Sequence, residues 1–333
     1  MRRCGCVCGR HCCGAAVNAD IKHWLWRCAA WLHRVDFAWI LPWIARLPMG
    51  LAYALARYRG QINAWTGRDW RSMGLGFRHI YRASLTGYAQ LPINSSEAQH
   101  HQWRSERFVA EARDEFEAQW IALGRVQELE CIFSTPDALQ SCKSRSRGLV
   151  LLTPHFESFF LGVGFLGRSG GVVNLMSSAV TKDPRVNAAV QRHFEKKYRG
   201  LEQYLNGGCV VDMEDGLRPF YAMLQRHETL VLLGDAPVLP QGVSMEVDFL
   251  GGMRALAGGG LRMAQRTGSD IGGFVCFPTG TGRYFMDWCE PGPADDPATV
   301  ARVYDFFSMH ILRNPGGWWA SDLLPAMPIK GQV

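Results

Sequence analysis

Residues 148–162 read GLVLLTPHFESFFLG, and this stretch decides the fold. Its first six residues form a short apolar run, which is typical of a strand buried on both faces of a sheet. Pro154 and His155 follow at once, where such a strand ends. The stretch therefore predicts a buried strand over 148–153 that delivers a histidine to the edge of a sheet.

Similar apolar runs recur along the rest of the chain, separated by amphipathic stretches. They predict strands at 172–176, 209–212, 229–235, 245–249, 271–277 and 284–289, and helices at about 183–198, 216–227, 258–267 and 297–313. Alternation of strands and helices predicts an α/β fold with a mixed, mostly parallel sheet flanked by helices. In such sheets ligands bind beyond the carboxyl ends of strands. The residues just after 153 and just after 234 are therefore the candidates for a site.

Two side chains that can carry chemistry stand at these places, His155 and Asp235. A neutral imidazole can act as general base on a bound hydroxyl. An Asp after a strand can orient a catalytic group, bind a basic substrate group or cap a turn. The residues alone leave both open, since a histidine in this position can also be structural.

The most apolar stretch is 36–56, DFAWILPWIARLPMGLAYALA. It is long enough to cross a bilayer, but Asp36, Pro42, Arg46 and Pro48 interrupt it. The pattern predicts two short helices, broken at the prolines, that lie in or dip into one leaflet of a membrane. The alternative is a helical hairpin packed on the protein's own core.

Charge is concentrated in the same part of the chain. The formal net charge is +6, and residues 20–95 contain ten Lys or Arg against three Asp. A basic, apolar and Trp-rich segment suits the anionic cytoplasmic leaflet of a membrane. Nucleic acid is the competing partner for a basic patch, but no recognition motif accompanies the charge, so we expect none. Periodicity in 107–123 predicts a surface helix that leads into the main domain, with Phe108, Ala112, Phe116 and Trp120 on one face.

The eleven cysteines do not indicate a disulfide framework. Five crowd the first thirteen residues and the rest are scattered, as in proteins of a reducing compartment. The N-terminal spacing matches no standard zinc pattern, although metal binding or acylation of these thiols is an alternative. We expect a Cys-rich disordered tail over 1–19, membrane-associated helices over 20–95, and an α/β domain over 96–333.

Four segments in order resemble the lipid A late acyltransferases, a family that includes lauroyl and myristoyl transferases. They are GLVLLTPHFESFFLG, LVLLGDAP, the Gly-rich GGMRALAGGGLRMAQRTGSDIGGFVCF and ILRNPGGWW, and the resemblance covers about 105–325. It implies a glycerolipid-acyltransferase-like fold on the cytoplasmic face of a bacterial inner membrane. It also implies transfer of a fatty acyl group from acyl carrier protein or coenzyme A to a glycolipid hydroxyl. In that reaction His155 is the general base, and no metal or tightly held cofactor is needed.

The chain departs from the family five residues after the histidine, where Phe160 replaces an acid that orients the imidazole. Three interpretations follow: Glu157 takes over that role, Asp235 does so, or the chain is an impaired homologue that acts as a membrane-associated accessory protein. A hydrolase that uses Ser158 is a further option, but no G-x-S-x-G elbow surrounds that serine.

A second departure follows the segment VVNLM. The family usually has an Arg there, thought to meet acceptor phosphate or sugar groups, whereas this chain has Ser177 and Ser178. Lys182, Arg185 and Arg192 are the nearby candidates for substrate binding, and the last two, seven residues apart, would share a helix face. The alternative is a solvated basic face of a helix.

Overall fold

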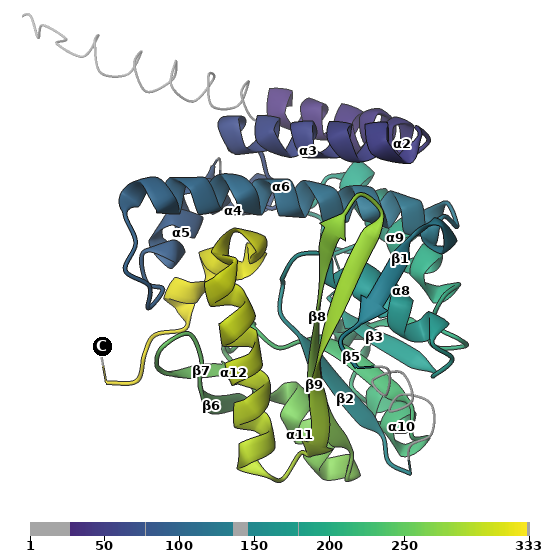
Figure 1. The fold of residues 1–333 in the computed structure, drawn as a ribbon, viewed down its shortest axis with the longest axis vertical. Helices are drawn as coiled ribbons and strands as arrows, with labels where there is room; N and C mark the ends of the chain where they lie inside the picture. Colours follow the sequence, from purple (N-terminus) through teal and green to yellow (C-terminus); the bar gives the residue numbers. More distant parts are fainter. Residues whose placement is uncertain (1–26, 77, 136–145, 179, 332–333) are drawn as a thin grey trace, which may run out of the picture.

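The structure, a computed structural model, describes residues 27–76, 78–135, 146–178 and 180–331 (Figure 1). Its main sheet has seven strands in the order β1-β9-β8-β2-β5-β3-β4. Neighbouring strands are parallel except for the antiparallel pair β8–β9. The predicted mixed, mostly parallel sheet is confirmed. The strands are β1 Glu130–Phe133, β2 Leu149–Thr153, β3 Val173–Ser177, β4 Val210–Asp212, β5 Thr229–Leu233, β8 Asp270–Gly280 and β9 Arg283–Pro293.

Strand β2 lies in the middle of the sheet and is buried at every residue. Leu149 and Leu151 belong to one hydrophobic cluster, and Val150 and Leu152 belong to another. Because side chains of a strand alternate between its two faces, these clusters are the cores above and below the sheet. The predicted helices cover them as α9 Ala188–Glu202, α10 Arg218–Gln225, α11 Gly259–Thr267 and α12 Pro297–Arg313, together with α8 Phe159–Arg168.

Two short strands differ from expectation. The strand predicted at 245–249 exists as β6 Ser244–Asp248, but it pairs only with β7 Met253–Ala257 in a separate antiparallel hairpin. Its turn is tight because Leu250 and Gly251 have φ angles of 50° and 82°. Strand β1 was not predicted, because its apolar run, Cys131 to Phe133, is only three residues long.

Helix α6 Glu97–Ala122 begins at a capping box formed by Ser96 and Gln99. The predicted stripe of Phe108, Ala112, Phe116 and Trp120 is buried. The prediction of a surface helix is wrong, because α6 lies between α3 and the layers built on the sheet (Figure 1). Sequence reasoning missed this because many polar residues of α6 are buried in ion pairs, which periodicity does not detect.

The apolar N-terminal stretch forms a helical hairpin that packs on the protein's own core. Residues 27–35 are helical and continue through η1 Asp36–Ile40 and α2 Leu41–Ile44, and after a turn α3 Met49–Thr66 runs back along α6. Only the predicted break at Pro48 is present, since the helix continues from the π-helical turn η1 through Pro42 into α2. None of the helices in the described ranges is long and apolar enough to span a bilayer.

Buried ion pairs fix α3 onto α6. Arg59 contacts Oδ2 of Asp36 and Oε2 of Glu115, each at 2.6 Å, and all three residues are buried. A Cβ at Gly60 would lie 2.6 Å from the Cα of Val109, so glycine permits the close approach of the two helices. Asp36 therefore serves the fold, and the two helices share a core with the sheet. The short helices α4 Ser72–Leu75 and α5 His79–Tyr88 follow, and α5 packs on α6 and on the C-terminal segment η5 Trp319–Ala326.

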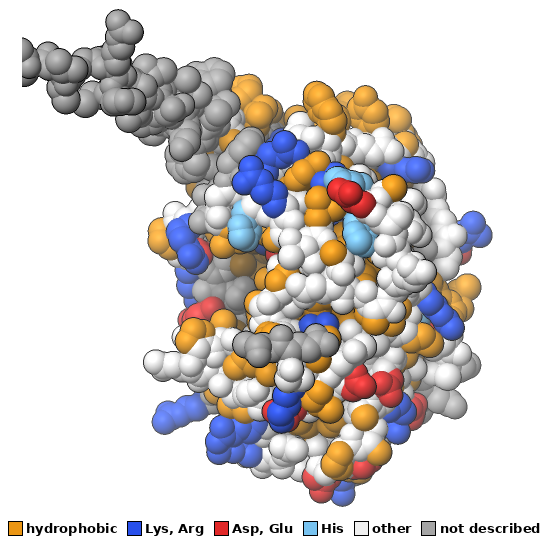
Figure 2. Space-filling view, turned by 90° about the vertical axis from the view of Figure 1, so that its left-hand side faces the viewer, with side chains coloured by type: hydrophobic (Ala, Val, Ile, Leu, Met, Phe, Trp, Pro, Cys, Tyr) orange, Lys and Arg blue, Asp and Glu red, His pale blue; other side chains and the backbone are white. Residues whose placement is uncertain are grey.

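The outer side of this hairpin is apolar, although it faces away from the core. We call it the N-terminal apolar face; its exposed members are Trp31, Leu32, Trp39, Ile40, Trp43, Leu51, Tyr58, Ile62 and Trp65. Trp65 is 82% exposed and Trp39 73%. Figure 2 shows hydrophobic side chains gathered along the upper edge of the molecule, where Figure 1 places α2 and α3. These apolar side chains are therefore presented to the outside of the hairpin.

Candidate active site

The register of the sheet brings His155 and Asp235 together. Thr153, the last residue of β2, pairs with Leu233, the last residue of β5, so both chains leave the sheet at the same edge. Oδ1 of Asp235 lies 2.8 Å from Nδ1 of His155. The backbone N–H of His155 donates to Oδ2 of the same carboxylate at 2.9 Å. One carboxylate therefore fixes both the ring and the backbone of the histidine.

Asp235 is completely buried, and further residues hold it. The indole Nε1 of Trp318 donates to Oδ2 at 2.7 Å, and the hydroxyl of Tyr304 donates to the carbonyl of Gly234 at 2.8 Å. Burial alone would raise the pKa of Asp235. The nearby His155 and the hydrogen bonds from His155 and Trp318 outweigh it, so the pKa lies below its usual value of 3.8. The carboxylate is therefore ionised at neutral pH.

The ring of His155 remains accessible at one side. Its side chain is 26% exposed, between the rings of Phe159 and Trp319, whose centroids lie 5.9 and 6.3 Å from its own. A carboxylate at Nδ1 favours the neutral tautomer that carries its hydrogen on that nitrogen. Nε2 then keeps a free lone pair, which is what a general base needs.

Glu157, the other acid considered for this role, points elsewhere. Its carboxylate pairs with Arg113 and accepts a hydrogen bond from Nδ2 of Asn314 at 2.6 Å. Its backbone has a φ of 50°, and its N–H donates to the carbonyl of Gly317 at 2.8 Å. In the described part of the chain it makes no contact with the imidazole. It ties the segment after β2 to α6 and to the C-terminal segment.

Phe160, five residues after His155, is part of the core. It is 2% exposed on α8, and Nζ of Lys197 lies 3.9 Å from the centroid of its ring. Lys197 in turn pairs with Asp114 at 2.7 Å. Position 160 therefore presents an apolar ring to the core, while Asp235 contacts Nδ1 of the histidine.

Ser158 is fully buried and belongs to a polar cluster beneath the site. Its hydroxyl donates to Oε1 of Glu117 at 3.0 Å, and the hydroxyl of Tyr284 donates to the same oxygen at 2.7 Å. Burial raises the pKa of Glu117 to about 7, although Arg113 opposes this shift. A hydroxyl so enclosed cannot meet a substrate, which argues against the hydrolase interpretation.

The three basic candidates for substrate binding lie on the outer surface. Lys182 pairs with Asp212 and Asp215, and Arg185 pairs with Asp183. Helix α9 begins at Ala188, so Arg185 precedes it and does not share a helix face with Arg192; that prediction is wrong. The helix starts late because Asn187 caps it, after Pro184 in the preceding turn. In the described ranges none of the three contacts His155 or Asp235.

Sequence reasoning missed Trp318, Tyr304, Arg113 and Glu117. Trp318 is fully buried, and the segment Pro315–Gly317 (η4) turns its indole toward Asp235. The pair Trp318–Trp319 in the ILRNPGGWW segment was the one available signal. Arg113 and Glu117 are four residues apart on α6, a spacing that also fits a solvated helix face. No cluster of His, Cys, Asp or Glu in the described ranges is placed to hold a metal ion, and the N-terminal cysteines lie outside those ranges.

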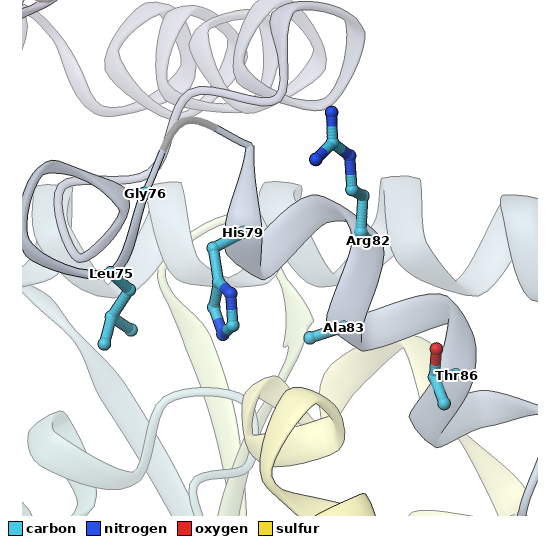
Figure 3. Close-up of a pocket in the computed structure, with 6 residues that line it drawn as sticks. All are labelled: Leu75, Gly76, His79, Arg82, Ala83 and Thr86. Atoms are coloured by element: carbon cyan, nitrogen blue, oxygen red, sulfur yellow. The ribbon is translucent and has the colours of Figure 1, made fainter.

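A cavity of about 490 Å³ lies along α4 and α5 (Figure 3). Its lining residues are Leu75, Gly76, His79, Arg82, Ala83 and Thr86. Neither His155 nor Asp235 lines it. Its volume falls within the range of small-molecule sites.

Comparison with known proteins identifies one family, and the matched residues include those of the site. The family model of the bacterial lipid A biosynthesis acyltransferases matches residues 105–320, which is more than half of the chain. The match begins within α6, includes His155 and Asp235, and ends just after Trp318 and Trp319. A search of curated proteins finds none that matches the chain.

Proposed function

Because the chain belongs to the bacterial lipid A biosynthesis acyltransferases, we propose that it acylates a hydroxyl of a glycolipid or lipid-linked saccharide, with His155 as general base. The observation that carries this proposal is the 2.8 Å contact between Nδ1 of His155 and Asp235. A buried carboxylate behind a partly exposed imidazole is the orienting arrangement of the hydrolase triads. Here the acceptor hydroxyl itself is the nucleophile.

The reaction has two proton transfers. Nε2 of His155 takes the proton of the acceptor hydroxyl while its oxygen attacks the carbonyl carbon of the acyl thioester. The C–S bond then breaks, the imidazolium returns the proton to the leaving thiolate, and the products are an ester and a free thiol. Asp235 stabilises the positive ring between these steps. It thus supplies what the acid absent at Phe160 would supply.

The proposed location is the cytoplasmic face of a bacterial inner membrane. Support comes from the N-terminal apolar face, whose exposed Trp39, Trp43 and Trp65 are suited to a membrane interface. The proposed donor is acyl carrier protein or acyl-coenzyme A. Acyl carrier proteins are acidic, and the net charge of +6 favours such a partner.

The second candidate is a membrane-associated accessory protein without catalytic activity. The phenylalanine at position 160 favours this candidate. The contact between Asp235 and His155 favours the catalytic candidate instead, because it provides a carboxylate beside the imidazole. The two candidates differ in one measurable property, the release of free thiol from an acyl thioester in the presence of acceptor.

The test is acyl transfer by the purified full-length protein, with mixed acyl carrier thioesters as donors and membrane lipid extract as acceptor. We expect ester product from the wild type and none above background from His155→Ala. His101→Ala is the matched control, because His101 is exposed on α6 and pairs only with Glu97 there. Equal background for wild type and His155→Ala would establish the accessory protein. Thioester cleavage that needs no acceptor would instead indicate a hydrolase.

A further inference from the structure

The surroundings of α5 contain positive charge without compensating acid. No Asp or Glu occurs from residue 70 to residue 96, whereas Arg71, Arg78 and Arg82 fall within this range. Arg71 is paired with Asp69 at 3.0 Å. In the described part of the chain, the side chains of Arg78, Arg82 and of Arg104 on α6 form no hydrogen bond or ion pair. Three guanidinium groups are therefore left without a protein acceptor.

Two of these groups are stacked on one tyrosine. The Cζ atoms of Arg104 and Arg78 lie 3.6 and 4.1 Å from the ring centroid of Tyr81. Arg104 is only 7% exposed, and its Nε and Nη1 are buried without a partner, as is Nε of Arg78. Burial lowers the pKa of Arg104, Tyr81 opposes the shift, and the neighbouring Arg78 adds to it. A buried cation without an acceptor is costly unless an anion joins it.

The third arginine, Arg82, lines the cavity along α5. Arg82 is exposed, four residues after Arg78, and it lines the 490 Å³ cavity together with His79 and Thr86. Figure 3 shows the lining residues distributed from Leu75, at the end of α4, to Thr86 on α5. A ligand with an anionic group at the arginines has room for its uncharged part beside the helix.

The stack also adjoins the N-terminal apolar face. Gly67 follows the last residue of α3, and a Cβ at this position would lie 2.7 Å from Nε of Arg78. Trp65, two residues earlier, is the most exposed member of that face. Figure 2 shows Lys, Arg and His side chains just below the hydrophobic upper edge. Arginines at the rim of an apolar surface lie at the depth of lipid headgroups.

We infer that Arg78, Arg82 and Arg104 bind the phosphate of a lipid headgroup, with the cavity along α5 receiving the rest of the polar head. Guanidinium groups bind phosphate through paired N–H donors, and the stack on Tyr81 holds two of them in place. The headgroup belongs either to bulk anionic phospholipid or to a phosphorylated glycolipid acceptor. The inference rests on the membrane association proposed above.

The test is partition of the full-length protein onto three kinds of vesicle: phosphatidylcholine alone, with added phosphatidylglycerol, and with an added phosphorylated disaccharide glycolipid. The site variant is Arg78→Gln/Arg104→Gln. The control is Arg46→Gln/Arg57→Gln, which removes the same charge from exposed positions near the apolar face. Non-specific attraction predicts equal loss in the two variants, at roughly fivefold per arginine. A phosphate site predicts that the site variant loses roughly tenfold more than the control.

The pattern of loss identifies the ligand. A larger loss on phosphatidylglycerol vesicles indicates bulk phospholipid, and a larger loss only on glycolipid vesicles indicates the acceptor; both support the site. Equal loss in site and control variants overturns it, as does a wild type that binds no vesicle. If the double variant does not fold, the exposed Arg82→Gln against Arg46→Gln gives the same comparison. Failure of the proposed enzymatic function is seen separately, as absent acyl transfer by a protein whose headgroup preference persists.

Discussion

The indole Nε1 of Trp318 donates a hydrogen bond to Oδ2 of Asp235 across 2.7 Å, and neither side chain reaches solvent. The two residues are 83 positions apart, and the bond joins the C-terminal segment to the end of β5. Since Oδ1 of the same carboxylate holds the ring of His155, Trp318 positions the proposed base through Asp235. It is a positioning residue in this account, because it touches no reacting atom.

Trp318→Phe should therefore lower kcat roughly tenfold and leave KM nearly unchanged, because it leaves a buried carboxylate oxygen short of one donor. The measurement is steady-state acyl transfer at a series of pH values. Trp120→Phe is the control, because Trp120 is also fully buried but its indole Nε1 has no hydrogen-bond partner among the residues that the structure describes. An equal fall in kcat in both variants would mean that only packing was lost.

An acid introduced at position 160 should not improve acyl transfer. Phe160→Glu places a carboxylate at a buried position of α8, while Asp235 already occupies Nδ1 of His155. We expect a lower melting temperature, since a buried charge is costly, and no gain in kcat/KM. Phe160→Leu is the matched variant that keeps the site apolar. An increase in kcat/KM for the Glu variant would show that an acid on α8 serves His155 better than Asp235 alone.

Glu157→Gln should affect stability more than chemistry. The substitution leaves Arg113 with one carboxylate partner, Glu117, in place of two. We expect loss of a few kcal/mol of unfolding free energy in a urea titration, because Arg113 becomes undercompensated. The pH dependence of kcat should keep its wild-type form in the folded fraction. A shifted pH profile would mean that Glu157 acts on His155 after all.

Glu117 should make the stability depend on pH. Burial raises its pKa to about 7 in the folded protein, against opposition from Arg113, whereas the unfolded chain releases this proton near its ordinary value of 4.5. The folded protein is therefore stabilised by the bound proton at low pH and loses that stability as the pH rises toward 7. Relative to wild type, Glu117→Gln should gain on the order of 1 to 3 kcal/mol of unfolding free energy between pH 4.5 and 8.

Urea unfolding at several pH values measures this difference. Glu97→Gln is the control, because the side chain of Glu97 is 89% exposed, and its effect should stay constant over the same range. A pH-independent difference for Glu117→Gln would show that Glu117 is ionised throughout.

The sequence predicted the elements that depend on apolar periodicity. The runs that became β2, β5 and β8 are buried on both faces, so composition reveals them. Their carboxyl ends then indicated His155 and Asp235, but sequence alone left Glu157 and Asp235 as equal candidates beside the imidazole. The choice depends on a single backbone angle, the φ of 50° at Glu157, and on the β2–β5 register. Neither can be read from residue types.

Other features depend on contacts between segments far apart in the sequence. Asp36 interrupts an apolar stretch in the sequence, and only its pairing with Arg59 in the next helix explains why it is tolerated in a core. Trp318 becomes part of the site only because the C-terminal segment crosses the end of β5. Helix α9 begins four residues after Pro184, so its predicted start at 183 was too early and Arg185 was placed on the wrong element. A local pattern contains none of this information.

In the proposed mechanism Asp235, rather than an acid on α8, makes His155 a base. The most direct measurement is kcat/KM for acyl transfer by Asp235→Asn, in protein shown by its thermal melt to be folded. Loss of an orienting carboxylate permits the wrong tautomer, so we expect a fall of roughly 10² to 10⁴-fold, and little further loss in His155→Ala/Asp235→Asn beyond His155→Ala alone. A folded Asp235→Asn protein with wild-type kcat/KM would contradict the account.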